Sequence, residues 1–139
     1  MRAKNFLEQV YLTALRVDSR LEQISHLQAM ATRTTSVMKS VPCSCSQSSS
    51  SRIETAIVSM QIQSDKLAEE IDTFLEARQK VSEVIMQLDN KTERVLLELR
   101  YLCFYSWQAI TKLMTLSRES VFRLHRNALN NVEKKIDTK

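Results

Sequence analysis

Residues 106–129 read SWQAITKLMTLSRESVFRLHRNAL, and this stretch decides how the C-terminal third of the chain is expected to fold. It contains two runs with the spacing of amphipathic helices, and each run follows a serine, a favoured residue at a helix N-terminus. The sequence therefore predicts a short helix over 107–114, a tight turn, and a longer helix from Arg118 into the region of residues 130–135. A short helix, a tight turn and a longer helix are typical of a helix-turn-helix.

In a helix-turn-helix the two helices cross on a small apolar core. The positions expected to form this core are all apolar, namely Ile110, Leu113, Leu116, Val121, Leu124 and Ala128. The same geometry turns a polar face outward, with Arg118, Glu119, Phe122, Arg123 and Arg126. Such a face suits the major groove of double-stranded DNA, because arginine pairs with guanine, glutamate accepts from cytosine, and a ring packs on the thymine methyl group.

Charge is unevenly distributed along the chain. Residues 91–139 hold ten Lys and Arg against five Asp and Glu, whereas residues 1–90 hold ten against eleven. A basic segment of this size is expected for a nucleic-acid-binding domain, although a solvated, lysine-rich tail would look similar. We expect base reading by the outward face, and phosphate contacts from Ser117, Arg126, Lys112 and the Lys134-Lys135 pair.

One more helix is predicted just before this motif. Asn90 followed by Glu93 has the spacing of a capping box, and an amphipathic pattern continues to Cys103. The predicted helix over 91–103 completes a three-helix DNA-binding domain over 91–139.

The N-terminal part predicts two long helices of similar length. Apolar residues repeat every seven positions over about 3–38 and again over about 53–88. Between them, residues 40–51 contain Pro42 and a serine-rich run, which predict a connector. Residues 1–90 are therefore expected to form a long, coiled-coil-like antiparallel helical hairpin, with Val10 near Val81 and Ile24 near Leu67.

A two-helix hairpin buries only one narrow stripe on each helix. It therefore needs a third helix or a second copy of itself. We expect a homodimer; the alternative is that the repeats form the core of a three-helix bundle within one chain.

The run LLELRYLCFYSWQAITKLMTLSRESVFRLHRNAL, Leu96–Leu129, resembles region four of bacterial sigma factors. The whole layout resembles small region-four-like transcriptional regulators of phages and prophages of Gram-positive bacteria. The resemblance implies a DNA-reading face at Ser117, Arg118, Glu119, Phe122, Arg123 and Arg126. It also implies that the hairpin sets dimer geometry or contacts host RNA polymerase.

The chain departs from this family at three positions. Phe104 and Thr115 stand where the family usually has glycine, and Thr111 replaces a small alanine. Threonine in a left-handed conformation costs on the order of 1 kcal/mol, so the turn is expected to be opened or differently shaped.

Several classes of function are excluded by composition. With no glycine and two histidines, the chain lacks phosphate-binding loops and any catalytic constellation, so we expect neither an enzyme nor a cofactor. Cys43 and Cys45 lack partners for a zinc site, and Cys103 is expected to be a buried apolar residue. No apolar run is long enough for a membrane span, and we expect the cytoplasm of a bacterial host.

The leading hypothesis is therefore an all-α, sequence-specific DNA-binding regulator of transcription. Two alternatives remain open: a protein-interaction module that acts through the hairpin, and a DNA-packaging recognition subunit like a small terminase. We further expect the one tryptophan, Trp107, to pack against the hairpin or the first helix of the DNA-binding domain rather than to stack on a base.

Overall fold

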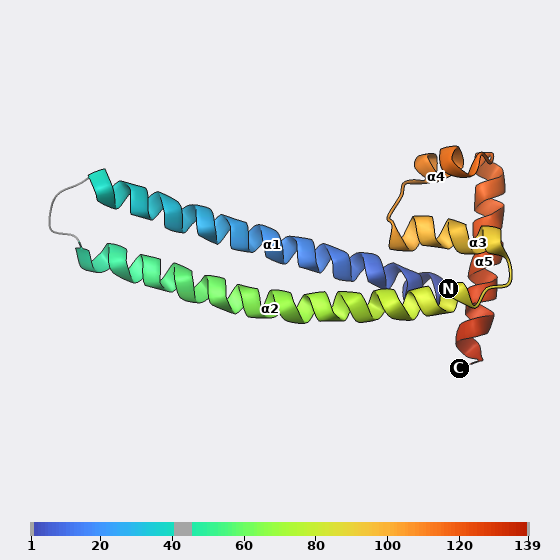
Figure 1. Ribbon diagram of the computed structural model, residues 1–139, viewed down its shortest axis with the longest axis horizontal. Helices are drawn as coiled ribbons and strands as arrows, with labels where there is room; N and C mark the ends of the chain where they lie inside the picture. Colours follow the sequence, from blue (N-terminus) through green and yellow to red (C-terminus); the bar gives the residue numbers. More distant parts are fainter. Residues whose placement is uncertain (1, 41–45, 139) are drawn as a thin grey trace. The chain divides into compact units, whose positions relative to one another are not determined.

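The computed structural model describes the backbone of residues 2–40 and 46–138, and the side chains of residues 2–33 and 51–138 (Figure 1). This part of the chain is all-helical and contains no strand, which confirms the predicted all-α class. None of its helices is long and apolar enough to cross a membrane. The elements in chain order are α1 (Arg2–Ser40), α2 (Ser46–Met86), α3 (Lys91–Leu97), the π-helical turn η1 (Glu98–Leu102), α4 (Trp107–Met114) and α5 (Arg118–Asp137).

The chain divides into two compact units. The first unit, called unit 1, comprises residues 1–14 and 73–139, and the second, unit 2, comprises residues 15–72. Unit 1 thus combines one end of each long helix with α3, η1, α4 and α5.

Unit 1 has a true hydrophobic core. Val10 and Val81, which were expected to lie near each other, are both fully buried in its main cluster. The same cluster contains Leu97 of α3 and Val132 of α5, so the ends of the long helices share one core with the C-terminal helices. Its remaining buried members are Ala3, Leu7, Ala77, Val84, Ile85, Leu88, Tyr101, Leu102 and Ala128.

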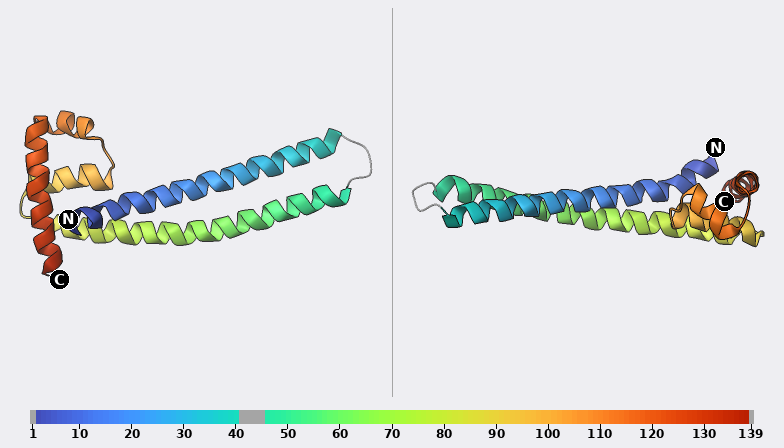
Figure 2. Two further views of the ribbon diagram at one scale, coloured as in Figure 1. Left: turned by 180° about the vertical axis from the view of Figure 1, so that it is seen from behind. Right: turned by 90° about the horizontal axis from the view of Figure 1, so that it is seen from above.

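In unit 2, α1 and α2 lie side by side and run in opposite directions (Figure 2). The guanidinium of Arg20 donates to Glu70 at 2.8 Å and to Gln63 at 2.6 Å, which fixes the register of the two helices. Ile24 and Leu67 are both half-buried. No described side chain between residues 15 and 72 is buried.

The connector between the long helices is shorter than predicted. It was expected over 40–51, but α2 already begins at Ser46. Residues 46–51 lack proline and glycine, so serine can extend a long helix at a modest cost in helix propensity. Cys43 and Cys45 lie outside the described residues.

The helix predicted over 91–103 begins as expected and ends differently. The Asn90 side chain accepts from the backbone N–H of Thr92 at 3.0 Å, which caps α3. The helix then widens after Leu97 into η1, where the N–H of Cys103 donates to the carbonyl of Glu98 at 2.9 Å. The prediction that Cys103 is buried is wrong: it follows this widened turn and is exposed.

Candidate nucleic-acid interface

Two serines begin the helices of this region, as predicted. Ser106 has an extended backbone, and its hydroxyl accepts from the N–H of Ala109 at 3.3 Å to cap α4. Ser117 does the same for α5 by accepting from the N–H of Ser120 at 3.2 Å. Both caps satisfy a backbone donor that a helix N-terminus leaves without an intrahelical partner.

The turn between α4 and α5 is closed by two backbone hydrogen bonds. Thr115 adopts a left-handed conformation with φ 53°, and its N–H donates to the carbonyl of Lys112 at 3.3 Å. The N–H of Leu116 donates to the carbonyl of Thr111 at 3.2 Å. This pair of bonds is a Schellman motif, which usually has glycine at the left-handed position. The expectation of an opened turn is therefore wrong, and threonine bears the strain instead.

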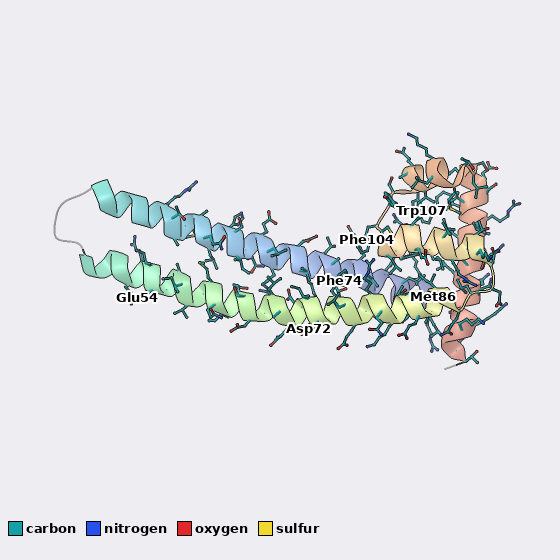
Figure 3. The ribbon with its side chains drawn as sticks, in the orientation of Figure 1. Glu54, Asp72, Phe74, Met86, Phe104 and Trp107 are labelled. Atoms are coloured by element: carbon teal, nitrogen blue, oxygen red, sulfur yellow. The ribbon has the colours of Figure 1, made fainter. Side chains whose placement is uncertain are left out.

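Phe104, the second position at which the region-four-like regulators usually have glycine, is also left-handed. Phe104 has φ 59°, and it and Thr115 are the two residues with positive φ in the described chain. Phe104 is labelled in Figure 3. Its ring centroid lies 5.5 Å from that of Tyr11 on α1, within unit 1. This packing helps to hold the strained backbone in place.

A second apolar cluster joins α4 to α5 and α3. Leu96, Ile110 and Val121 are fully buried in it. The half-buried residues packed on these three are Leu99, Trp107, Met114, Leu116 and Leu124. The predicted core position Leu113 is wrong, because its side chain is 59% exposed. Positions 107, 110 and 114 form the inward stripe of this short helix, and residue 113 lies about 100° away from Met114.

The residues predicted to face outward do so. Arg118, Glu119, Phe122, Arg123 and Arg126 on α5 are exposed, as are Ser117 and Lys112. On the opposite side of α5, Val121 and Ala128 are fully buried and Leu124 is half-buried. The three arginines of this helix and Lys134 are therefore accessible, whereas Lys135 is half-buried.

Phe122 is 37% exposed and also belongs to an aromatic cluster. Its ring centroid lies 5.0 Å from that of Trp107, and the guanidinium of Arg118 lies 5.6 Å from it on α5. Trp107 also contacts Arg100 of η1, whose guanidinium lies 4.7 Å from the indole centroid. Trp107 thus packs between η1 and α5, and the contact with the Phe122 ring restrains Arg118.

His125 lies at the inner end of this cluster. Its Nε2 is 2.9 Å from the hydroxyl of Tyr101, and its ring is 4.9 Å from that of Trp107. Burial, together with the nearby charges of Arg100 and Lys4, lowers the pKa of His125 to about 4. Burial and the charge of Glu8 raise the pKa of Tyr101 to about 12. Both rings are therefore neutral at pH 7, and His125 adds no positive charge to the interface.

Two outward residues of α5 were not singled out from the sequence. Asn127 and Asn130 are exposed. Asn127 follows Arg123 by four residues and Asn130 follows Arg126 by four, so they extend the same strip of the helix. This spacing could have revealed them, and asparagine pairs well with adenine in the major groove.

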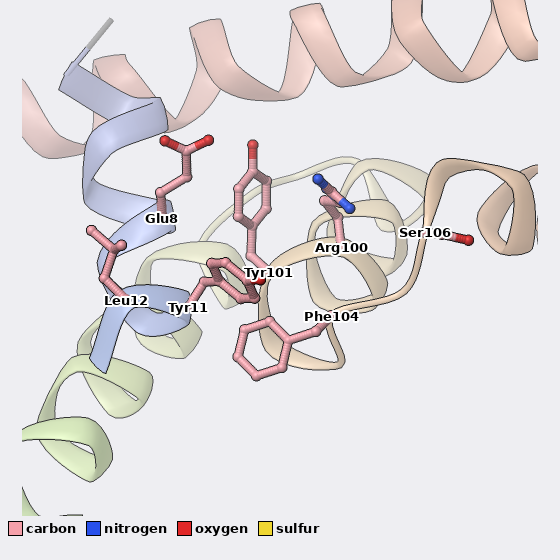
Figure 4. A pocket seen from close by; sticks show the side chains of 7 residues that line it. All are labelled: Glu8, Tyr11, Leu12, Arg100, Tyr101, Phe104 and Ser106. Carbon is pink, nitrogen blue, oxygen red and sulfur yellow. The ribbon is translucent and has the colours of Figure 1, made fainter. Parts of the chain in front are cut away.

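Unit 1 also has a pocket on the side of η1 that faces α1 (Figure 4). It has a volume of about 390 Å³ and is lined by Glu8, Tyr11, Leu12, Arg100, Tyr101, Phe104 and Ser106. Its polar groups already have partners: Arg100 donates to the carbonyl of Tyr105 at 3.0 Å, and Tyr101 is bonded to His125. We therefore assign it no ligand.

Neither a metal site nor similarity to a known protein indicates another role for this region. Over the described residues, no group of three or more His, Cys, Asp or Glu side chains could hold a metal ion. No protein-family model, no curated protein and no solved structure matches the chain.

Proposed function

We propose that residues 91–138 form a helix-turn-helix domain that binds double-stranded DNA sequence-specifically, with α5 in the major groove. The observation that supports this most directly is the division of α5 into two faces. Val121 and Ala128 are fully buried, whereas Arg118, Arg123 and Arg126 are exposed. A helix that exposes its arginines while its apolar side packs on the rest of the unit is suited to major-groove reading.

The outward residues divide into base-reading and phosphate-contacting sets. Arg123 lies one turn inside α5 and has the reach to bond guanine in two places. Arg118, held over Phe122, and Glu119 lie in the first turn, which in this motif contacts the base edges. Lys112, Ser117 and Arg126 lie at the margins, where contacts to phosphates position a protein on the duplex.

The turn geometry supports the family-level proposal. The two left-handed residues, Phe104 and Thr115, are those at which the resembled region-four-like regulators usually have glycine. Left-handed residues at both positions, in a chain without glycine, support the backbone path that the resemblance implies. We therefore propose a transcription regulator of phage type, with RNA polymerase as a candidate second partner.

The proposal is tested by selecting binding sites from a pool of random duplexes with the full-length protein. We expect one enriched sequence, bound with an affinity that falls steeply as salt rises, because basic residues displace counterions from the phosphates. Fluorescence anisotropy on the enriched and on a scrambled duplex measures both effects. Equal affinity for the two duplexes would leave only non-specific binding, and no binding at low salt would reject DNA as the partner.

A further inference from the structure

Four side chains from three elements of unit 1 form a continuous line of contacts that ends on the exposed side of α5. The guanidinium of Arg100 on η1 lies 4.7 Å from the ring centroid of Trp107 on α4. The Trp107 ring lies 5.0 Å from that of Phe122 on α5, and the guanidinium of Arg118 lies 5.6 Å from the Phe122 centroid. We call these four residues the cation–aromatic chain. It links η1 and α4 to the first turn of α5.

The inner part of this chain is anchored to the core of unit 1. Trp107 is half-buried, and the His125 ring packs edge-on against it at 4.9 Å. His125 is bonded at 2.9 Å to the hydroxyl of Tyr101, which is 5% exposed and belongs to the main core cluster. On the other partner of Trp107, Arg100 donates to the backbone carbonyl of Tyr105 at 3.0 Å. The indole is therefore held by two groups that each have a second anchor.

The outer part of the chain has fewer restraints. Phe122 is 37% exposed, and Trp107 is the ring on which it packs. Arg118 is exposed, and the ion pairs among the described residues do not include it. A cation in the first turn of a helix is disfavoured by the helix dipole, so Arg118 does not stabilise α5 by its charge. Its contact with Phe122 is what limits its rotamers.

The other two arginines of α5 differ in this respect. Among the described arginines, Arg100 and Arg118 lie over aromatic rings, whereas Arg123 and Arg126 do not. Two arginines on one exposed helix face are thus held differently, and Arg123 serves as an internal reference for Arg118.

We propose that Trp107 is a positioning residue for base reading, which acts through Phe122 to hold Arg118 ready to bond a guanine. This inference rests on the proposed DNA binding and deepens it. A side chain that is restrained before binding loses less rotamer entropy when it binds, and for one long side chain this is worth roughly two- to tenfold in affinity. The gain is realised on a duplex that offers Arg118 its base, so the restraint raises sequence preference.

A purely structural role for Trp107 gives a different result. If the indole only packed α4 on α5, its loss would lower stability and weaken every duplex by a similar factor. Preference at one base pair, measured relative to the others, separates the two roles.

The test uses the full chain, the selected duplex and a set of duplexes that each change one base pair. The base pair read by Arg118 is the one whose change no longer costs affinity in Arg118→Ala, and Arg123→Ala identifies its own base pair in the same way. In anisotropy titrations, Trp107→Leu should lower the discrimination at the Arg118 base pair by about two- to tenfold. Discrimination at the Arg123 base pair should stay as in wild type.

Three further variants serve as controls. Trp107→Phe should keep most of the discrimination, because a ring still packs on Phe122. Trp107→Met fills the space with a flexible side chain, so it keeps the fold if leucine does not, and it should lose the discrimination. Asn131→Ala lowers stability without touching the cation–aromatic chain and should leave the discrimination unchanged.

A double-mutant cycle completes the test. In the Arg118→Ala background, Trp107→Leu should cause no further loss at the Arg118 base pair, because the residue on which it acts is gone. Additive losses, equal weakening of all duplexes by Trp107→Leu, or an Arg118→Ala that affects no single base pair would overturn the inference. A wild type without any sequence preference would reject the proposed function itself. A selective wild type whose preference survives Trp107→Leu would overturn this inference alone.

Discussion

The backbone N–H of Leu116 donates to the carbonyl oxygen of Thr111 at 3.2 Å, and this bond closes the turn that joins α4 to α5. Thr115, which lies between these two residues in the turn, is left-handed with φ 53°. A β-branched residue is strained in that conformation. The orientation of α5 on its support is thus set by a strained turn.

Thr115→Gly should stabilise the protein, because glycine accepts positive φ without steric strain. We expect the free energy of unfolding to rise by about 1 kcal/mol. The higher conformational entropy that glycine gives the unfolded chain offsets part of this gain. Thr111→Gly is the matched control: it lies within α4 and should lower stability by a few tenths of a kcal/mol up to about 1 kcal/mol. Urea unfolding measures both, and a loss of stability in Thr115→Gly would contradict the strained-turn interpretation.

A buried carboxylate joins α3 to α5. Glu93 is 5% exposed, and it accepts from the side-chain amide of Asn131 at 2.9 Å. Asn131→Ala should lower the free energy of unfolding by about 1–3 kcal/mol, because it removes the donor and leaves the buried acceptor without it. Asn130→Ala, on the exposed side of α5, should change stability by less than about 0.5 kcal/mol. Similar values for the two variants would mean that the contact contributes little.

The stability of unit 1 should depend on pH through His125. Its pKa is lowered to about 4, whereas the unfolded chain has an ordinary histidine value of 6.5. Between these values the unfolded state binds the proton and the folded state does not, so stability falls as pH falls from 6.5 toward 4.

We expect His125 to lower the free energy of unfolding by about 1 kcal/mol between pH 7 and pH 5. This value is reduced because the ring is partly exposed and solvent screens it. Urea unfolding at pH 7 and pH 5 measures it, with His125→Phe as the comparison because phenylalanine fills the site without titrating. If wild type and variant lose the same stability over this range, His125 is not the source.

Phe122 has a structural as well as a proposed DNA-reading role. Because its ring packs on Trp107, Phe122→Ala should lower the free energy of unfolding by about 1–3 kcal/mol. Leu113→Ala removes a side chain that is more exposed, 59% against 37%, and should cost less than about 0.5 kcal/mol. Thermal unfolding of the two variants compares them directly, and a neutral Phe122→Ala would place the ring outside the core.

Local signals predicted much of the C-terminal region. The three caps at Asn90, Ser106 and Ser117 depend on a single side chain and its nearest backbone donors, so they could be predicted from the sequence. The outward arginines followed from the same logic, because helical periodicity fixes which residues oppose Val121.

What could not be predicted depends on contacts between distant segments. The helix widens into η1, and Cys103, which follows, is exposed. No pattern in residues 98–102 predicts this widening. Glu93 was expected only to cap its own helix, but its carboxylate bonds Asn131, 38 residues away. Leu113 and Met114 are both apolar, and only the packing of α4 on α5 decides which of them is buried.

The central claim, that α5 reads bases in duplex DNA, is tested most directly by comparing Arg123→Ala with Arg52→Ala. Both arginines are exposed, and both variants lose one positive charge, but Arg52 lies on α2 in unit 2. On the selected duplex, anisotropy titrations should show Arg123→Ala weakened by about 1–3 kcal/mol, with preference relaxed at one base pair. Arg52→Ala should bind as wild type does. Equal loss in both variants, on selected and scrambled duplexes alike, would contradict base reading by α5.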